Sequence, residues 1–155
     1  MKYSNVLPQL IARLALGIGF ILPVMDRFGI LGGPGTKGIY WGEWSKFIDY
    51  TNYILPILNR DLSNAMGIFV TVCEILFGIG LTVGIKTRYM AMGSAALTVS
   101  FGVCMAVFLG IQAPFSYPVF VFTGAALLLS QADKFEWSID QFMEKSKKNE
   151  KLIKL

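Results

Sequence analysis

The sequence predicts an all-α fold, a four-helix transmembrane bundle, from two observations. Charged residues make up only 15% of the 155 residues and hydrophobic residues 54%, whereas about a quarter of the residues of a soluble domain are charged. Four apolar runs each approach the roughly 20 residues that a membrane-spanning helix needs. We therefore predict one integral membrane domain over residues 1–155, with spans at about 6–25, 63–85, 89–110 and 115–131.

The first span, residues 6–25, contains a single charged residue, Arg13, about two turns from its start. Two interpretations of Arg13 stay open. Its long side chain can carry the guanidinium to the nearer membrane surface, or the guanidinium turns inward and pairs with an acidic residue of another span.

The connection over residues 26–62 is predicted to be extracytoplasmic and begins with an irregular stretch rich in Gly and Pro. Apolar residues then recur at helical spacing over residues 43–55, and Pro56 is expected to end or kink this helix. The segment is too short and too polar to span a membrane. We predict an amphipathic helix that lies in the interface or caps the bundle mouth, as a plain anchor or as a lid.

The second span, residues 63–85, carries Glu74 near its middle. A carboxylate is costly in hydrocarbon and normally finds a partner or water there. Glu74 is therefore either a polar group that packs inside the bundle or part of a ligand or proton site. In the same span Gly80 and Gly84 form a G-x-x-x-G pattern, which lets two helix backbones approach closely.

The distribution of basic residues predicts the orientation. With four spans, both termini share a side with the 86–88 turn, and that side carries nine basic residues: Lys2, Lys86, Arg88 and six lysines of the tail, residues 133–155. The other side carries four: Arg27, Lys37, Lys46 and Arg60. The positive-inside rule places both termini in the cytoplasm. We predict a short amphipathic helix in the cytoplasmic tail.

A candidate cavity lies at the outer end of the bundle. Its predicted ligand-binding residues are Glu74, Arg13, Asp26, Arg27, Trp41 and Trp44. A mouth with charges and aromatic walls suits an amphipathic molecule such as a quinone or a lipid. The alternative is that the aromatic residues only mark the membrane interface, as Trp and Tyr often do.

The two cysteines, Cys73 and Cys104, are the candidate redox residues. They form no C-x-x-C pair, and we expect both to be reduced and unbridged, since buried cysteines usually pack as ordinary apolar residues. The chain contains no histidine, which excludes His-ligated haem, His-bound zinc and a His general base. We expect no metal site and no intrinsic cofactor, with a quinone as the one candidate, and we name no catalytic residue.

Two sequence motifs resemble those of the DoxX-like family of small four-span bacterial membrane proteins. The first is R-x-x-x-G at Arg13–Gly17, and the second is E-x-x-x-G-x-x-L-x-x-G-x-x-T-R from Glu74 to Arg88. The loop beginning DRFGILGGPG also resembles a bacterial subgroup, and the likeness covers roughly residues 10–131. Many relatives carry G-x-x-K after the first span, where this chain has the residues 26–29, Asp-Arg-Phe-Gly.

The resemblance implies a multi-pass four-helix bundle in a bacterial inner (cytoplasmic) membrane and a link to thiosulfate:quinone oxidoreduction or thiol redox defence. The leading hypothesis is a quinone- or thiol-linked redox-associated subunit that acts with a soluble or membrane redox partner; whether it is an enzyme stays open. The alternatives are a non-enzymatic binder or carrier of a quinone or lipid, and a scaffold that recruits partners through its basic tail. We expect contact with the lipid bilayer and none with nucleic acid, and leave a homo-oligomer open.

The sharpest structural prediction is that Arg13 and Glu74 are partners. Counted from the cytoplasmic ends of their spans at about 1.5 Å per residue, the two lie at depths roughly 8 Å apart. A long arginine stem can bridge that difference, and an opposite charge is the simplest way to stabilise each group inside a membrane.

Overall fold

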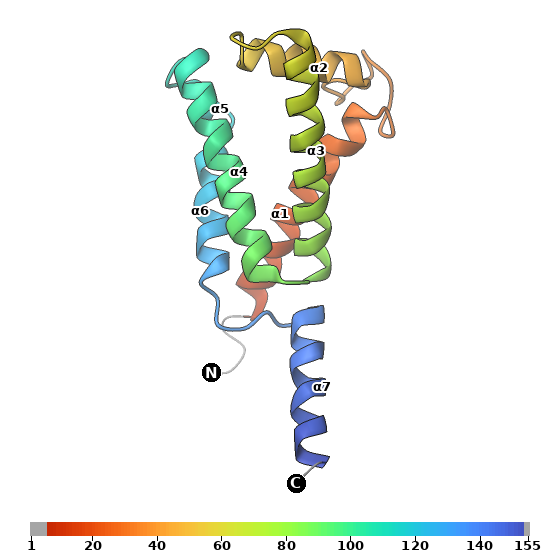
Figure 1. The fold of residues 1–155 in the computed structure, drawn as a ribbon, viewed down its shortest axis with the longest axis vertical. Coiled ribbons are helices and arrows are strands. Elements are labelled where there is room, and N and C mark those ends of the chain that lie inside the picture. Colours follow the sequence, from red (N-terminus) through yellow and green to blue (C-terminus); the bar gives the residue numbers. More distant parts are fainter. Residues whose placement is uncertain (1–5, 154–155) are drawn as a thin grey trace.

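The computed structural model describes residues 6–153, with side chains up to residue 149. Seven helices follow one another (Figure 1): α1 (Val6–Arg27), α2 (Trp44–Ile54), α3 (Arg60–Val83), α4 (Thr87–Phe108), α5 (Ala113–Ser116), α6 (Val119–Ser130) and α7 (Ile139–Ile153). Helices α1, α3 and α4 are long and apolar enough to cross a membrane, and α6 is a shorter apolar helix. The all-α prediction is confirmed for the described residues, and the long apolar helices indicate a multi-pass membrane protein.

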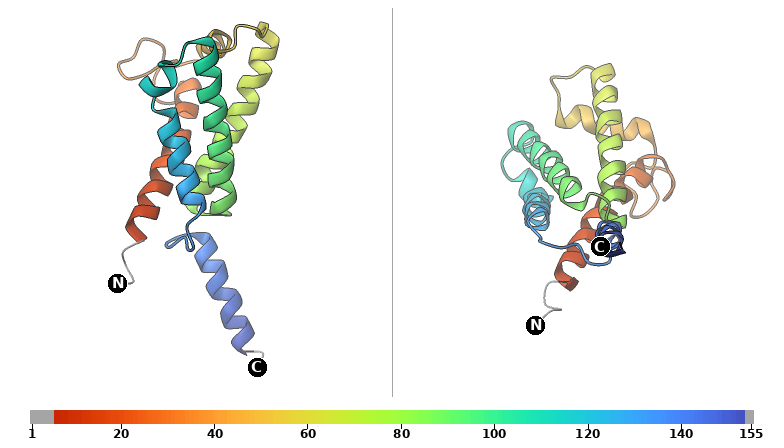
Figure 2. Two further views of the ribbon diagram at one scale, coloured as in Figure 1. Left: turned by 90° about the vertical axis from the view of Figure 1, so that its left-hand side faces the viewer. Right: turned by 60° about the horizontal axis from the view of Figure 1, so that its bottom comes forward.

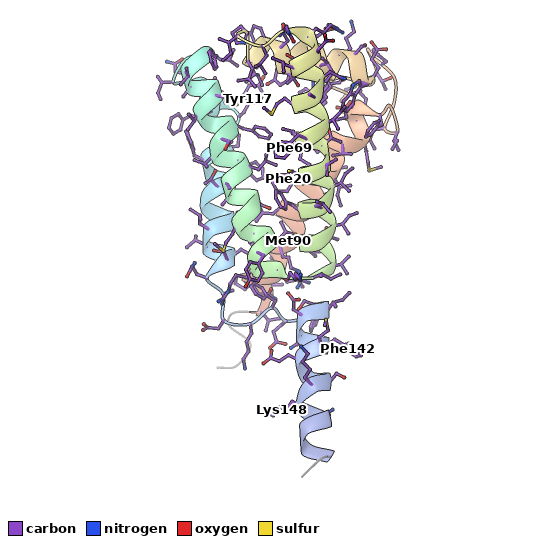
Figure 3. All side chains as sticks on the ribbon, in the orientation of Figure 1. Phe20, Phe69, Met90, Tyr117, Phe142 and Lys148 are labelled. Atoms are coloured by element: carbon purple, nitrogen blue, oxygen red, sulfur yellow. The ribbon has the colours of Figure 1, made fainter. Side chains whose placement is uncertain are left out.

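The bundle consists of two helix pairs, α1 with α3 and α4 with α6. Figure 1 and the left view of Figure 2 show that α3 and α4 lie close together at the turn that joins them and diverge toward α2. We call these regions the α7 end and the α2 end. The buried core fills the space between the pairs, with Phe20 and Met90 between them (Figure 3). Its members are Leu16, Phe20, Leu81, Ala91, Ala95, Ala126 and Leu129.

Helices α1 and α3 touch through glycine. A Cβ atom at Gly78 would lie 2.7 Å from Ile21 Cγ1 and 3.1 Å from the carbonyl oxygen of Gly17. Gly80 and Gly84 admit close neighbours, but not the backbone of a second helix. A Cβ at Gly80 would lie 2.6 Å from the Met90 side chain of α4. Gly84 ends α3 in the left-handed conformation, with φ of 78°, and a Cβ there would lie 3.0 Å from Ser138 Cα.

Helix α2 confirms the amphipathic helix predicted over residues 43–55. It ends at Ile54, before Pro56, with Phe47 and Ile48 buried and Asp49 exposed. It lies against the outermost turns of α3, where Gly67 makes room for it: a Cβ at Gly67 would lie 2.6 Å from Ile48 Cδ1. Of the two predicted placements, the described structure has the helix capping the open end of the bundle (Figure 1).

The fourth predicted span, residues 115–131, is interrupted. Helix α5 ends at Ser116 and α6 begins at Val119. Pro118 has no N–H to donate, and it disfavours helical conformation at the residue before it, Tyr117. Helix α6 has 12 residues, so it is only about 18 Å long, well short of the roughly 30 Å of a bilayer core.

The predicted tail helix forms within residues 133–155, as α7 from Ile139 to Ile153. It projects from the bundle (Figure 1). The Asp140 carboxylate accepts hydrogen bonds from the backbone N–H of Lys86 at 2.8 Å and of Thr87 at 2.7 Å. It thereby satisfies free donors at the start of α4, where a negative charge is favourable. Lys2 and Lys154, counted in the predicted charge asymmetry, lie outside the described residues.

The glycine contact between α1 and α3 predicts a difference between two matched variants. Gly78→Ala places a methyl group against the backbone of Gly17, and such overpacking typically costs about 1–3 kcal/mol. Gly124→Ala on α6 adds the same methyl group where no other atom lies within 4 Å. Thermal unfolding in detergent should show a lowered melting temperature for Gly78→Ala only. Equal melting temperatures would contradict the contact.

Candidate functional site

Two neighbouring residues at the end of α1, Asp26 and Arg27, face different parts of the molecule. The Asp26 carboxylate accepts hydrogen bonds from the backbone N–H groups of Tyr40 at 2.9 Å, Trp41 at 3.2 Å and Gly42 at 2.8 Å. These bonds tie the irregular loop to the end of α1, and they fix the position of Trp41. Asp26 is therefore a structural support of the site.

Arg27 turns into the bundle and is 1% exposed. Its Nη2 lies 2.7 Å from Glu74 Oε2, and Nη1 donates to Thr71 Oγ1 at 2.7 Å. The guanidinium carbon stands 3.8 Å from the centre of the Phe47 ring, a cation–π distance. Arg27 thus joins α1, α2 and α3 at one point.

The partners of Arg27 on α3 share one helix face. Gly67, Thr71, Glu74 and Gly78 are buried and recur at three- and four-residue spacing. Within this stripe, Gly67 admits α2, Thr71 and Glu74 hold Arg27, and Gly78 admits α1. A single face of α3 therefore assembles the site.

The predicted pair of Arg13 and Glu74 is wrong. Arg13 lies at the α7 end, where it donates to the carbonyl oxygens of Glu136 at 3.3 Å and Trp137 at 2.6 Å. The depth estimate failed because it used a common membrane plane for both helices. In the structure α3 starts at Arg60 and its first turns lie beside α2, beyond the end of α1 (Figure 1), so Glu74 is level with Arg27.

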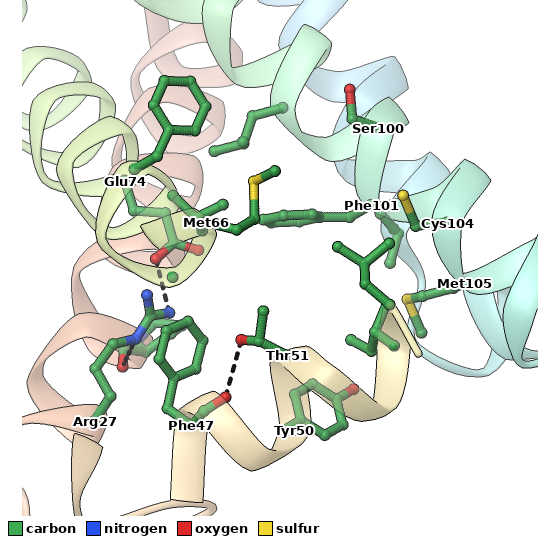
Figure 4. A pocket seen from close by; sticks show the side chains of 18 of the residues that line it. Arg27, Phe47, Tyr50, Thr51, Met66, Glu74, Ser100, Phe101, Cys104 and Met105 are labelled. Atoms are coloured by element: carbon green, nitrogen blue, oxygen red, sulfur yellow. Dashed lines mark hydrogen bonds and ion pairs between the residues drawn. The ribbon is translucent and has the colours of Figure 1, made fainter. Parts of the chain in front are cut away.

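The Arg27–Glu74 pair lies in the wall of a cavity of about 500 Å³ between the diverging helix pairs. Figure 4 shows the pair on one side, α2 with Tyr50 and Thr51 on another, and Phe101, Cys104 and Met105 of α4 opposite. Most of the lining is hydrocarbon or aromatic. The remaining lining residues are Pro23, Trp41, Phe47, Ile54, Leu55, Met66, Gly67, Phe69, Val70, Leu97, Ser100, Tyr117 and Val119.

Glu74 keeps hydrogen-bonding capacity inside this apolar surrounding. Its Oε2 lies 2.7 Å from Arg27 Nη2 in an ion pair, which engages this buried oxygen. A carboxylate has two oxygens and about four acceptor positions, so this one contact does not exhaust the Glu74 carboxylate. The cavity wall therefore carries an acidic acceptor beside the guanidinium of Arg27.

Tyr50 adds a third polar group to the cavity. Burial, with Tyr117 and Tyr53 nearby, raises the pKa of its hydroxyl, so this phenol is neutral at pH 7. A neutral phenol both donates and accepts hydrogen bonds. Tyr50 thus adds a polar group to the cavity wall without adding charge.

The structure brings together some of the predicted site residues and separates others. Glu74, Arg27 and Trp41 line the cavity, as does Cys104. Trp44 stacks on Phe28 with ring centres 5.6 Å apart and lines no described cavity. Cys73 also lies outside the cavity lining, and both thiols are free.

Sequence reasoning missed several contributors, although signals for two of them were present. Thr71 precedes Glu74 by three residues, so it had to lie on the same helix face. Tyr117 belongs to an aromatic cluster beside Pro118, which marked an irregular segment. For Phe47 and Tyr50, on the inward face of α2, no sequence pattern indicated which helix they would pack against.

No protein-family model, curated protein or solved structure matches this chain.

The ion pair predicts strong coupling in a double-mutant cycle. Arg27→Met or Glu74→Met alone leaves a buried charge without its partner, which typically costs about 3–5 kcal/mol. The double variant should be less destabilised than the sum of the two single variants. The measurement is the free energy of unfolding in detergent.

Arg13→Met supplies the control for this cycle. Arg13 and Glu74 share no partner in the described structure, so their effects should add to within about 0.5 kcal/mol. Coupling of Glu74 to Arg13 instead of Arg27 would overturn the assignment.

Proposed function

We propose that this chain is a membrane protein that binds a small amphipathic molecule of the quinone class in the cavity beneath α2. The observation that carries this proposal is the buried Arg27–Glu74 pair, which forms a polar patch in an otherwise apolar cavity of about 500 Å³. Small-molecule sites typically combine an apolar lining, a few oriented polar groups and a volume of about 300–1,000 Å³.

The chemistry of the two charged side chains suits a quinone head group in both redox forms. The Arg27 guanidinium donates hydrogen bonds, as a quinone carbonyl oxygen requires. The Glu74 carboxylate accepts them, as the hydroxyl groups of the reduced form require. Aromatic side chains such as Phe101 and Trp41 line the cavity, and aromatic contacts with a flat ring are typically worth about 0.5–1.5 kcal/mol beyond area burial.

A redox role follows from the chemistry that a quinone supplies when bound, the reversible uptake of two electrons and two protons. Glu74 is placed to accept a hydrogen bond or a proton from the reduced head group. The resemblance of the segment from Glu74 to Arg88 to DoxX-like proteins supports a quinone-linked redox-associated subunit. The electrons would come from a separate reductant protein, in keeping with the subunit hypothesis.

A carrier or storage role is the second candidate. It is favoured by the absence of Cys73 from the cavity lining, which leaves Cys104 as the only cysteine among the lining residues. Without a second thiol in the cavity, the described residues offer no dithiol that could exchange electrons with a bound molecule. The two candidates share the same binding site and differ in whether the bound molecule changes its redox state.

Intrinsic tryptophan fluorescence tests the binding site directly. Quinones quench nearby tryptophan, and Trp41 lines the cavity while Trp137 lies at the α7 end. A variant that retains only Trp41 should show saturable quenching by decyl-benzoquinone in lipid nanodiscs. A variant that retains only Trp137 should show no saturable component.

The same titration tests the ion pair. Arg27→Met combined with Glu74→Met should weaken binding to the Trp41-only protein at least tenfold, or about 1.4 kcal/mol, while Arg13→Met should leave it unchanged. Quenching that is equal in all variants, or that never saturates, would contradict the proposed site.

We further propose a bacterial inner-membrane location with both termini in the cytoplasm. The location is supported by the resemblance to DoxX-like proteins of bacteria, and the orientation by the asymmetry of nine basic residues against four. Reporter fusions after residue 155 and within residues 32–38 should report cytoplasm and exterior respectively. Reversed signals would place the cavity on the cytoplasmic side.

A further inference from the structure

A second cavity, of about 810 Å³, adjoins the first. It lies between α1 and α6, under the irregular loop. Five residues line both cavities, namely Pro23, Trp41, Tyr50, Tyr117 and Val119. The two cavities therefore share a wall, and together they extend across the bundle beneath α2.

We propose that the second cavity is the subsite for the apolar chain of the ligand whose head group occupies the first. This inference rests on the proposed function, because the head group is placed at Arg27 and Glu74. The ligand class is thereby narrowed to a molecule with a compact polar ring and a long hydrocarbon or isoprenoid chain.

The chemistry of the second cavity supports a chain rather than a second head group. Leu22, Leu31, Val119 and Phe122 supply an apolar surface. Its acidic residue, Asp26, already accepts three backbone hydrogen bonds, so it has little capacity left for a ligand. Lys46 is exposed, which places it at the rim rather than in the interior.

Two tyrosines, Tyr50 and Tyr117, stand in the shared wall. Tyr117 occupies the break between α5 and α6 and is 56% exposed. A side chain with this exposure has room to change rotamer without displacing a packed helix. The break at Pro118 thus places an exposed aromatic residue between the two cavities.

The apolar chain of the ligand has one competing route. The first cavity is bordered by α3 and α4, which diverge toward α2 (Figure 1), and a chain could leave between them into lipid. The position of the chain end distinguishes the two routes, whereas binding affinity does not. Lipid tails are as apolar as the cavity wall, so moving a chain from one to the other changes the binding free energy little.

Photo-cross-linking with two probes locates the ring and the chain separately. Both probes are 1,4-benzoquinones with a ten-carbon chain, one with a diazirine beside the ring and the other with a diazirine at the chain end. The full-length protein is labelled in phosphatidylcholine nanodiscs, with and without excess decyl-benzoquinone, and cross-linked peptides are mapped by mass spectrometry. Competed labelling by the ring probe is expected in residues 66–74 or 97–105, and by the chain probe in residues 22–31 or 118–122.

Two variants on α1 complete the test. Leu22→Trp fills the second cavity only, and it should reduce competed labelling of residues 118–122 by the chain probe at least fivefold while ring labelling persists. Ile18→Trp is the matched control, because Ile18 is one turn away, is 48% exposed against 46% for Leu22, and lines neither cavity. It should change neither labelling pattern.

The outcomes separate the two proposals. If the ring probe labels the first cavity but the chain probe labels α3 and α4 on their lipid side, or Leu22→Trp has no effect, the chain subsite is overturned and the binding site stands. If the ring probe shows no competed labelling of the first cavity, both proposals fail.

Discussion

The burial of two opposite charges inside an apolar bundle is the constraint on which the rest of this structure depends. Arg27 is 1% exposed and Glu74 is 5% exposed, and either charge alone in such a place would be strongly unfavourable. Their pairing resolves most of this cost. Thr71 takes a further N–H of Arg27, and the Phe47 ring covers the face of the guanidinium.

The loop and the capping helix are arranged around this pair. The Asp26 carboxylate accepts hydrogen bonds from backbone N–H groups of the loop, and the loop leads into α2. Gly67 lets α2 approach α3 so closely that Phe47 reaches Arg27. Because α2 spans the open end, the helix pairs can stay apart there, and a cavity remains where a simple four-helix bundle would have closed.

The closed end of the molecule depends on a different set of polar contacts. Asp140 caps α4, and the buried guanidinium of Arg13 holds the carbonyl groups of residues 136 and 137. The segment before α7 is thus bound to the same end at which the core is tightly packed. The two buried arginines therefore have separate tasks, one at the cavity and one at the base of the tail.

Helix positions could largely be predicted from the sequence, because apolar runs and helical periodicity are local properties. The α2 helix over residues 43–55 and the importance of Glu74 both came from such patterns. The partner of Glu74 could not be predicted in this way. It depends on how far α3 extends past the end of α1, which is set by packing at Gly67 and Gly78 rather than by either helix alone.

The break in the fourth span was only partly predictable. Pro118 signalled an irregularity near the start of the run, but an early proline is also compatible with a continuous helix. Tyr117 lines both cavities because the helix is interrupted at this residue. No local sequence pattern specified the position of the interruption. The two cavities arise from long-range packing, and for that reason they were not foreseen in detail.

Native mass spectrometry of gently extracted protein tests the central claim most directly, namely that the Arg27–Glu74 pair holds a small amphipathic ligand. The wild-type protein should retain a bound small molecule that fragmentation identifies as a quinone. The Arg27→Met, Glu74→Met double variant should lose that mass, and the Arg13→Met variant should keep it. A wild-type protein that carries no such molecule, or a double variant that retains it equally well, would contradict the account.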